Sequence, residues 1–290
     1  MLGILLVHKP VGVTSHDVVN DVRRRFGTKR VGHAGTLDPL ASGVLVVAVG
    51  PATRFLQYLP LEPKVYVADI VFGHSTTTYD AEGELSKALP VPENLTSVLE
   101  SVLPQFRGLI QQQPPIYSAV KVGGKAMYKY ARSGQEVERE FRTVHITSYE
   151  VLSASENQVK ARIICSGGTY IRSLANDLGQ TIGCGAYLSG LVRTDVGRFS
   201  IDQTTHLKDL TPECLIPLHQ ALPPMPLIPL DELQTANIRE GRQITLTETP
   251  TATMVALLEP SGTVFSVARV DGNVLQPECV IPSGVPHATS

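Results

Sequence analysis

The sequence predicts an α+β protein with a mixed, mostly antiparallel central sheet, flanking helices and a small β-rich C-terminal domain. Predicted strands occur both in clusters and in pairs, and the helices between them are unevenly spaced. A doubly wound parallel sheet would instead alternate strands and helices regularly. No glycine-rich phosphate-binding motif of the dinucleotide or P-loop type follows a strand, so the sequence does not predict a nucleotide cofactor.

The first fifty residues predict a strand, a helix, a loop and a second strand. Residues 3–8 are apolar and end at a Lys-Pro turn. Thr14-Ser15 can cap a helix that runs to about Phe26, with valines recurring every four residues on its buried face. Residues 31–42 are rich in glycine and small polar residues and predict a loop, and residues 43–49 predict a buried strand.

The middle of the chain predicts further strands, two helices and an insertion. The strands are expected over residues 65–72, 144–152, 159–165 and 188–196, and the helices over 92–103 and after Gly167-Gly168. The regular spacing of apolar residues is lost over residues 111–134. There we expect an extended loop, a short hairpin and a short helix that stand off the core. The whole insertion is expected to span about residues 105–142.

The proline-rich stretch 222–226 predicts a hinge between two domains. Residues 1–222 would form the larger domain, and residues 223–282 a small β-rich one. Strand candidates at 243–246, 254–258 and 264–270 support the second domain. Residues 283–290 are expected to be a disordered tail.

Composition favours a globular protein in the cytoplasm. The chain has 290 residues, of which 42% are hydrophobic and 18% charged. No apolar run approaches the roughly 20 residues that cross a bilayer, and no signal peptide is evident. The four cysteines form no closely spaced pair, so neither a metal site nor redox chemistry is predicted.

The net charge of −2 conceals an uneven distribution. Residues 1–60 and residues 105–142 each carry seven Lys or Arg against three acidic residues, whereas residues 206–290 carry four against nine. Phosphate binding depends on local basic surface, so the first two sectors allow a nucleic-acid ligand. Charge alone does not distinguish this from ordinary solvated helix faces.

The loop of residues 30–43 contains a candidate catalytic carboxylate, Asp38. Glycines at 32, 35 and 43 allow backbone conformations and close approaches that a Cβ would block. Pro39 restricts Asp38 to extended geometry, which can aim its carboxylate. On these residues alone, Asp38 could be a nucleophile, a base, a metal ligand or a turn acceptor.

The run Gly32-His33-Ala34-Gly35-Thr36-Leu37-Asp38-Pro39-Leu40-Ala41-Ser42-Gly43 resembles the catalytic motif of the TruB family of pseudouridine synthases. Five more segments resemble family motifs in the family's order: 9–15 (KPVGVTS), 64–66 (KVY), 114–125 (PPIYSAVK followed by GK), 165–174 (CSGGTYIRSL) and 191–193 (LVR). The resemblance covers roughly residues 3–200. The fold of the family is the α+β fold that is expected above.

The resemblance implies the conversion of a tRNA uridine to pseudouridine without cofactor or metal. Asp38 would be the nucleophile, and Arg172 would pair with it, lowering its pKa and keeping it ionised. The base would be flipped into a pocket with Tyr66 as stacking platform and Tyr170 and Leu191 as walls. His33 would insert near the vacated base position.

Basic residues would hold the RNA backbone. Arg54 stands where the family usually has a lysine facing RNA. The insertion carries further candidates for phosphate contact, namely Lys121, Lys125, Tyr128, Lys129 and Arg132. A flexible loop of solvated lysines is the alternative.

The resemblance further implies a C-terminal PUA-like domain and a monomer that binds the T-arm of tRNA and modifies uridine 55. The acidic balance of residues 206–290 is unfavourable for phosphate contact. Two other readings remain: an RNA-binding or RNA-folding module, and a synthase guided to another RNA by partner proteins, which would favour a longer chain with basic tails.

Overall fold

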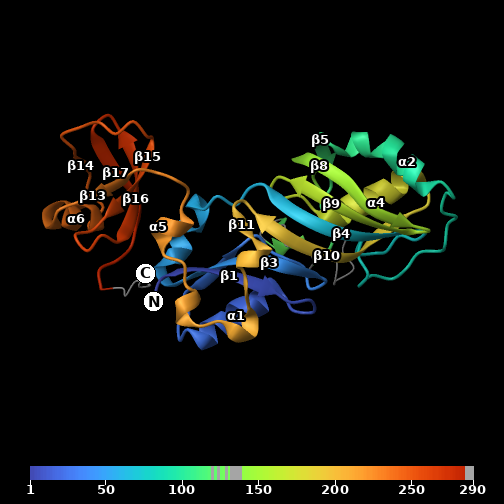
Figure 1. The fold of residues 1–290 in the computed structure, drawn as a ribbon, viewed down its shortest axis with the longest axis horizontal. Helices are drawn as coiled ribbons and strands as arrows, with labels where there is room; N and C mark the ends of the chain where they lie inside the picture. Colours follow the sequence, from blue (N-terminus) through green and yellow to red (C-terminus); the bar gives the residue numbers. More distant parts are fainter. Residues whose placement is uncertain (119–120, 123–124, 128–129, 131–138, 285–290) are drawn as a thin grey trace.

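The computed structural model describes residues 1–118, 121–122, 125–127, 130 and 139–284. It confirms the α+β class: one large mixed sheet lies in the N-terminal part, and a second sheet forms the C-terminal domain (Figure 1). None of the helices in these ranges is long and apolar enough to cross a membrane.

The large sheet has the strand order β12-β1-β3-β10-β4-β9-β8-β5, with β2 paired to β3 and β11 to β10. Its strands are β1 Gly3–Lys9, β2 Val31–Ala34, β3 Ala41–Val49, β4 Lys64–Phe72, β5 Gly108–Gln112, β8 Arg142–Ser155, β9 Gln158–Cys165, β10 Ala186–Val196, β11 Phe199–Ser200 and β12 Thr205–His206. Only the pairs β1–β12 and β3–β10 are parallel. The β3–β10 pair brings the end of the Asp38 loop beside the strand that carries Leu191.

Helix α1 (Ser15–Arg25) follows the prediction closely. Thr14 is its N-cap, and a capping box links the side chains of Thr14 and Asp17 to each other's backbone N–H groups. Val18 and Val22 are fully buried against β1 and β3. The helix therefore packs on one face of the sheet and ends in the predicted arginine cluster.

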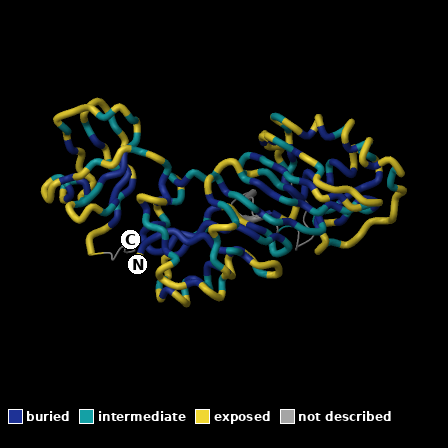
Figure 2. Tube along the Cα trace, in the orientation of Figure 1, coloured by how far each residue is buried: buried dark blue, intermediate teal, exposed yellow. Residues whose placement is uncertain are grey.

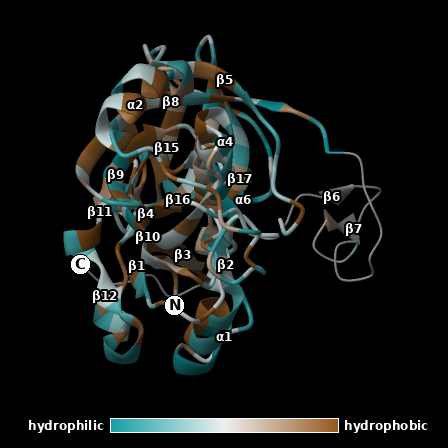
Figure 3. Ribbon diagram, turned by 90° about the vertical axis from the view of Figure 1, so that its right-hand side faces the viewer, coloured by the Kyte–Doolittle hydropathy of each residue, from teal (hydrophilic) through white to brown (hydrophobic). Residues whose placement is uncertain are grey.

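The rest of the sheet is covered by α2 (Leu95–Val102), η2 (Leu103–Phe106) and α4 (Ile171–Ile182). Figure 3 shows α2 and α4 against β8 and β9, where hydrophobic residues gather. Short connecting elements complete this part: η1 Gly50–Tyr58, η3 Ile201–Gln203, η4 Leu207–Asp209, η5 Pro212–Cys214 and α5 Leu218–Ala221. Within the predicted insertion, β6 (Lys121–Val122) pairs with β7 (Lys125–Ala126), as the hairpin prediction required. Most of the helix predicted after it lies outside the described residues.

The prediction of a loop over residues 31–42 is wrong for its first four residues. Residues 31–34 form strand β2, which pairs antiparallel with the far end of β3. Val31 and Ala34 are buried by this pairing, although Gly32 and His33 between them interrupt any apolar pattern. A segment of four residues with only two apolar ones is too short for an alternating apolar pattern to predict a strand.

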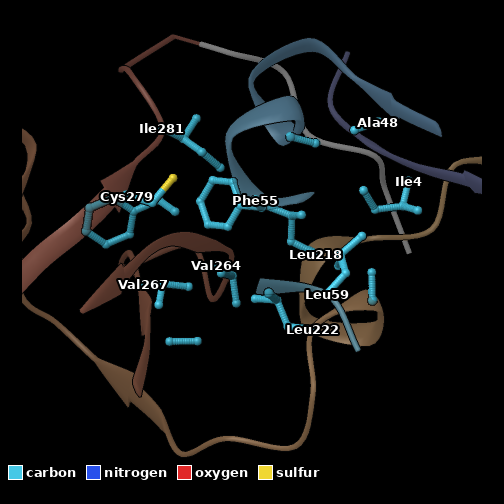
Figure 4. Close-up of a cluster of buried hydrophobic side chains, with 14 of the residues drawn as sticks. Ile4, Ala48, Phe55, Leu59, Leu218, Leu222, Val264, Val267, Cys279 and Ile281 are labelled. Carbon is cyan, nitrogen blue, oxygen red and sulfur yellow. The ribbon is translucent and has the colours of Figure 1, made fainter. Parts of the chain in front are cut away.

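The C-terminal domain has the sheet order β13-β15-β16-β17-β14 and one helix, α6 (Glu232–Arg239). Its strands are β13 Leu227–Pro229, β14 Ile244–Thr245, β15 Met254–Leu258, β16 Val264–Asp271 and β17 Val274–Val280. Buried residues of this sheet join those of the large sheet in one hydrophobic cluster (Figures 2 and 4). Phe55 of η1 lies at its centre, between Ile281 and Leu218. Leu222 of the predicted hinge segment belongs to this cluster and Met225 packs against it, and the hinge stays a prediction.

Candidate active site

The Asp38 loop joins β2 to β3 and is anchored through the residue before Asp38. Leu37 is 3% exposed, its N–H donates to Ser15 Oγ at 2.8 Å, and the Ser15 hydroxyl lies 3.0 Å from the Leu37 carbonyl. Gly12 N–H donates to the Pro39 carbonyl at 2.8 Å. The start of α1 and the turn before it therefore hold the loop on both sides of Asp38.

Two fully buried cations fix the ends of the loop. Lys9 Nζ donates to the carbonyl of Ala41 at 2.6 Å and to that of Pro10 at 2.9 Å. Arg193 donates to the carbonyls of Gly35 at 3.0 Å and Val44 at 2.8 Å. Burial lowers the pKa of Lys9 to about 8, although the nearby Asp38 carboxylate opposes this.

The glycines of the loop are required at two of the three predicted positions. Gly43 has φ +104°, and a Cβ there would lie 2.2 Å from the Arg193 carbonyl oxygen. Gly35 has φ +75°, beside the side chains of Arg193 and Lys64. The expectation is wrong at Gly32, which has no positive φ and where a Cβ would make only ordinary contacts from 3.6 Å.

Arg172, in the first turn of α4, reaches Asp38 as predicted. Its Nε lies 2.9 Å from Asp38 Oδ2, in an ion pair whose angle is not that of a hydrogen bond. Its Nη1 contacts Asp80 Oδ2 at 3.2 Å and the Thr78 carbonyl at 3.2 Å. Its Nη2 donates to the Tyr117 carbonyl at 2.9 Å. The guanidinium is 5% exposed and lies between two carboxylates.

Asp80 is a buried member of this site that the sequence analysis missed. Its side chain is 3% exposed, and Oδ1 accepts from the Thr78 hydroxyl at 2.5 Å and from the Glu82 N–H at 3.1 Å. Residues 74–84 are a run of threonines, acidic residues and glycine, which in the sequence looks like any surface turn. Only the fold, which bridges Asp80 to Leu188 of β10, makes the segment part of the core.

The pKa of Asp38 is raised overall, although Arg172 acts to lower it, as expected. Burial is the largest cause, and Arg172 opposes it. The Asp80 carboxylate shares the same guanidinium and raises the pKa further. The side chain of Asp38 nevertheless keeps 37% of its surface exposed, so this carboxylate can meet an incoming ligand.

The predicted pocket residues come from neighbouring strands. Tyr66 of β4 is 6% exposed and belongs to the same hydrophobic cluster as Leu37 and Leu191. Its register partner on β10 is Arg193, which opposes the increase that burial causes in the Tyr66 pKa. Leu191 pairs with Ala41 of β3, directly after the Asp38 loop. The sheet thus brings Tyr66 and Leu191 to the loop.

Tyr170 and His33 lie at the edges of this site. Tyr170 is the N-cap residue of α4, and burial raises its pKa while a hydrogen bond with the Ser118 side chain opposes the shift. His33 lies on β2, and its pKa is lowered by burial and by the neighbouring Arg193 and His16. The buried Nδ1 of His33 has no hydrogen-bond partner among the described residues.

Arg54, Lys121 and Lys125 are the predicted RNA-backbone residues that lie in the described part of the chain. Arg54 lies on η1 and donates to the Val280 carbonyl of β17 at 2.9 Å, at the junction with the C-terminal domain. Lys121 and Lys125 lie on β6 and β7. Tyr128, Lys129 and Arg132 lie outside the described residues.

The described residues contain no group of three or more His, Cys, Asp or Glu that could hold a metal ion. All four cysteines are free.

Comparisons with known proteins agree with the motifs. The model for the N-terminal domain of TruB family pseudouridylate synthases matches residues 23–171, and the model for the C-terminal domain of tRNA pseudouridylate synthase B matches residues 172–239. The tRNA pseudouridine synthase B of Thermobifida fusca (strain YX) is 43% identical, covering 96% of this chain and 98% of that protein. The one from Mycobacterium tuberculosis (strain H37Rv) is 45% identical, over 72% of this chain and 71% of that protein.

Solved structures show the same fold. A Cbf5-Nop10-Gar1 complex contains a chain that superposes with a TM-score of 0.69 at 26% identity, covering 97% of this chain and 85% of that chain. A chain in an H/ACA RNP bound to a substrate RNA superposes with a TM-score of 0.65 at 24% identity, covering 98% and 85%. Since both family models and relatives above 40% identity match, the chain belongs to the TruB family of pseudouridylate synthases.

Proposed function

We propose that this chain isomerises uridine 55 in the TΨC loop of tRNA to pseudouridine, with Asp38 as nucleophile and without a cofactor. The observation that carries the proposal is the Asp38–Arg172 ion pair, in which a partly exposed carboxylate is oriented by a buried cation. The tRNA substrate is supported by the relatives named tRNA pseudouridine synthase B.

The reaction needs only groups that this site offers. The bond between C1′ and N1 of the uridine breaks, the uracil turns, and a bond forms between C1′ and C5. N1 gains a proton and C5 loses one, so the product is an isomer. Asp38 attacks the nucleoside to hold it between these steps, and Arg172 keeps the carboxylate aimed.

The uridine must leave its stack before Asp38 can reach it. Tyr66 is the proposed platform for the flipped base, with Tyr170 and Leu191 as walls and His33 near the vacated position. The arrangement of β4, β10 and α4 around the Asp38 loop supports this assignment. Stacking on an aromatic side chain is worth about 1–3 kcal/mol and tolerates any base, so the pocket walls would supply the preference for uracil.

We assign the grip on the RNA backbone to the catalytic domain, through Arg54, Lys121, Lys125, Lys129 and Arg132. In the described part of the C-terminal domain every arginine is already paired with a glutamate: Arg239 with Glu259, Arg242 with Glu240, and Arg269 with Glu278. Phosphate binding by those arginines would have to compete with these pairs. The charges therefore favour a packing role for the C-terminal domain over a phosphate-binding one.

The test compares wild type with Asp38→Asn on unmodified tRNA transcripts tritiated at uracil C5, where pseudouridine formation releases the label. We expect release by wild type and none by the variant, and no release from a transcript with cytidine at position 55. Asp69→Asn is the matched control, because Asp69 is a carboxylate in an exposed ion pair with Lys160. Release by Asp38→Asn at the wild-type rate would remove Asp38 from the mechanism.

A further inference from the structure

Gln112 makes a two-point contact with the start of α4. It is the last residue of β5 and is 2% exposed. Its Oε1 accepts from the Tyr170 N–H at 2.8 Å, and its Nε2 donates to the Tyr170 carbonyl at 3.0 Å. The Tyr170 carbonyl also accepts the first helical hydrogen bond from the Leu174 N–H at 3.1 Å, so the Gln112 amide accepts from the Tyr170 N–H and is a second donor to its carbonyl.

The contact requires an amide with both functions. The Tyr170 N–H can only donate and the Tyr170 carbonyl can only accept, so the two ends of the Gln112 amide cannot be exchanged. Tyr170 is the N-cap of α4 but its side chain makes no capping bond, and its backbone N–H donates to Gln112. Gln112 therefore fixes both the position and the direction of the first residue of the helix.

Two further hydrogen bonds continue the contact along the first turn of α4. The Ser173 hydroxyl donates to the Gln113 carbonyl at 2.9 Å, and Arg172 Nη2 donates to the Tyr117 carbonyl at 2.9 Å. Both Ser173 and Arg172 are buried. The segment that follows β5 is thereby joined to Ser173 and to Arg172, the partner of Asp38.

We propose that Gln112 is a positioning residue for the reaction. Its amide sets the first turn of α4, and through that turn it sets Tyr170 and Arg172 relative to Asp38. The inference rests on the proposed function of Asp38 and Arg172. It assigns no contact between Gln112 and the substrate, so loss of its amide affects the rate of the bound complex more than RNA binding.

The first test is Gln112→Ala, measured by tritium release under steady-state conditions. We expect kcat to fall about 10- to 100-fold, as small misplacements of reacting groups do, with KM changed by less than about threefold. Gln111→Ala is the matched control, because Gln111 is the exposed neighbour whose amide donates to the Thr143 hydroxyl at the surface. Circular dichroism and thermal unfolding of each variant measure the folded fraction.

The second test is Gln112→Glu, which separates positioning from general stability. An ionised glutamate can accept from the Tyr170 N–H but cannot donate to the Tyr170 carbonyl, whereas the protonated acid can do both. The ratio of the variant's kcat to that of wild type should therefore rise as the pH falls, while the ratio for Gln112→Ala stays constant. The pH dependence of the Gln112→Glu ratio can be measured even if Gln112→Ala is poorly folded.

The outcomes separate this inference from the proposed function. If wild type releases no tritium from tRNA, the proposed function fails. If wild type is active and Gln112→Ala keeps wild-type kcat, or the Gln112→Glu ratio is flat with pH, the role of Gln112 is overturned while the function stands.

Discussion

Arg172 contacts Asp80 in an ion pair that is buried on both sides, at 3.2 Å and with side chains 5% and 3% exposed. The same guanidinium contacts Asp38, whose side chain is 37% exposed. Asp80 therefore serves as the fixed counter-ion of Arg172, and Asp38 faces solvent. The two acids differ in exposure, which is the basis for assigning them different roles.

Replacing Asp80 should change the pH dependence of the reaction. Asp80 contributes to the raised pKa of Asp38, so Asp80→Asn is expected to lower that pKa. The acid limb of kcat/KM against pH, which reports the free enzyme, should move to lower pH. We also expect kcat to fall about tenfold or more, because Arg172 loses its fixed counter-ion. Asp69→Asn should leave the profile unchanged, and an unmoved acid limb in Asp80→Asn would contradict the assignment.

Lys9 should make stability depend on pH between about 8 and 10.5. Burial lowers its folded-state pKa to about 8, whereas the unfolded chain keeps its proton to about 10.5. In this window the unfolded state binds more protons, so the free energy of unfolding rises with pH. Urea unfolding of wild type and Lys9→Met at pH 7.5 and 9.5 should show wild type gaining about 1–2 kcal/mol relative to the variant. Exposed Lys87→Met is the control, and a pH-independent difference for Lys9→Met would refute the prediction.

Phe55 should couple the two domains. It is fully buried in the cluster shared by the large sheet and the C-terminal sheet. Phe55→Ala is expected to lower the free energy of unfolding by about 3–5 kcal/mol. Leu233→Ala, at a side chain 73% exposed on α6, should cost little. A shared core also predicts one urea transition for wild type, and two resolved transitions would instead support the hinge.

Tyr149 should tolerate loss of its hydroxyl. The hydroxyl is buried without a hydrogen-bond partner among the described residues, and burial raises its pKa above the usual range. An unsatisfied buried polar group costs about 1–3 kcal/mol, so Tyr149→Phe should be neutral or more stable in thermal unfolding. Tritium release should stay at the wild-type rate. A marked loss of stability would mean that the hydroxyl has a partner.

The sequence predicted most of the large sheet because its strands are apolar runs with clear limits. Helix α1 was equally clear, since capping residues and a four-residue valine repeat coincide there. The strands β2, β5, β11, β12, β13 and β17 escaped prediction. The end of β5 also corrects the loop that was expected to stand off the core from residue 111. Strands such as β13 form by pairing with partners distant in the sequence, as Leu227 pairs with Ala256 of β15, and no local pattern contains that information.

Site residues that lie within a sequence motif were predictable, whereas site residues that only the fold brings to the site were not. Asp38, Tyr66 and Arg172 could be named from the family resemblance, and the Asp38–Arg172 contact is confirmed. Asp80 and Gln112 were missed because a polar residue in a turn and one glutamine among three look ordinary. The lowering effect of Arg172 on the Asp38 pKa was predicted, but the net increase was not, because burial and a second carboxylate are properties of the folded chain.

Gln112 and Arg142 are register partners at the ends of β5 and β8, so the chain leaves and re-enters the sheet at adjacent points. A connection with adjacent ends can be lengthened, shortened or exchanged without shifting the register of either strand. Gln113 and Tyr117 hold the first turn of α4 through their carbonyls, so the exchangeable cassette is the stretch between Ser118 and Arg139. Transplanting the cassette of a relative, with the amide at 112 retained, offers a route to new RNA targets on an unaltered catalytic scaffold.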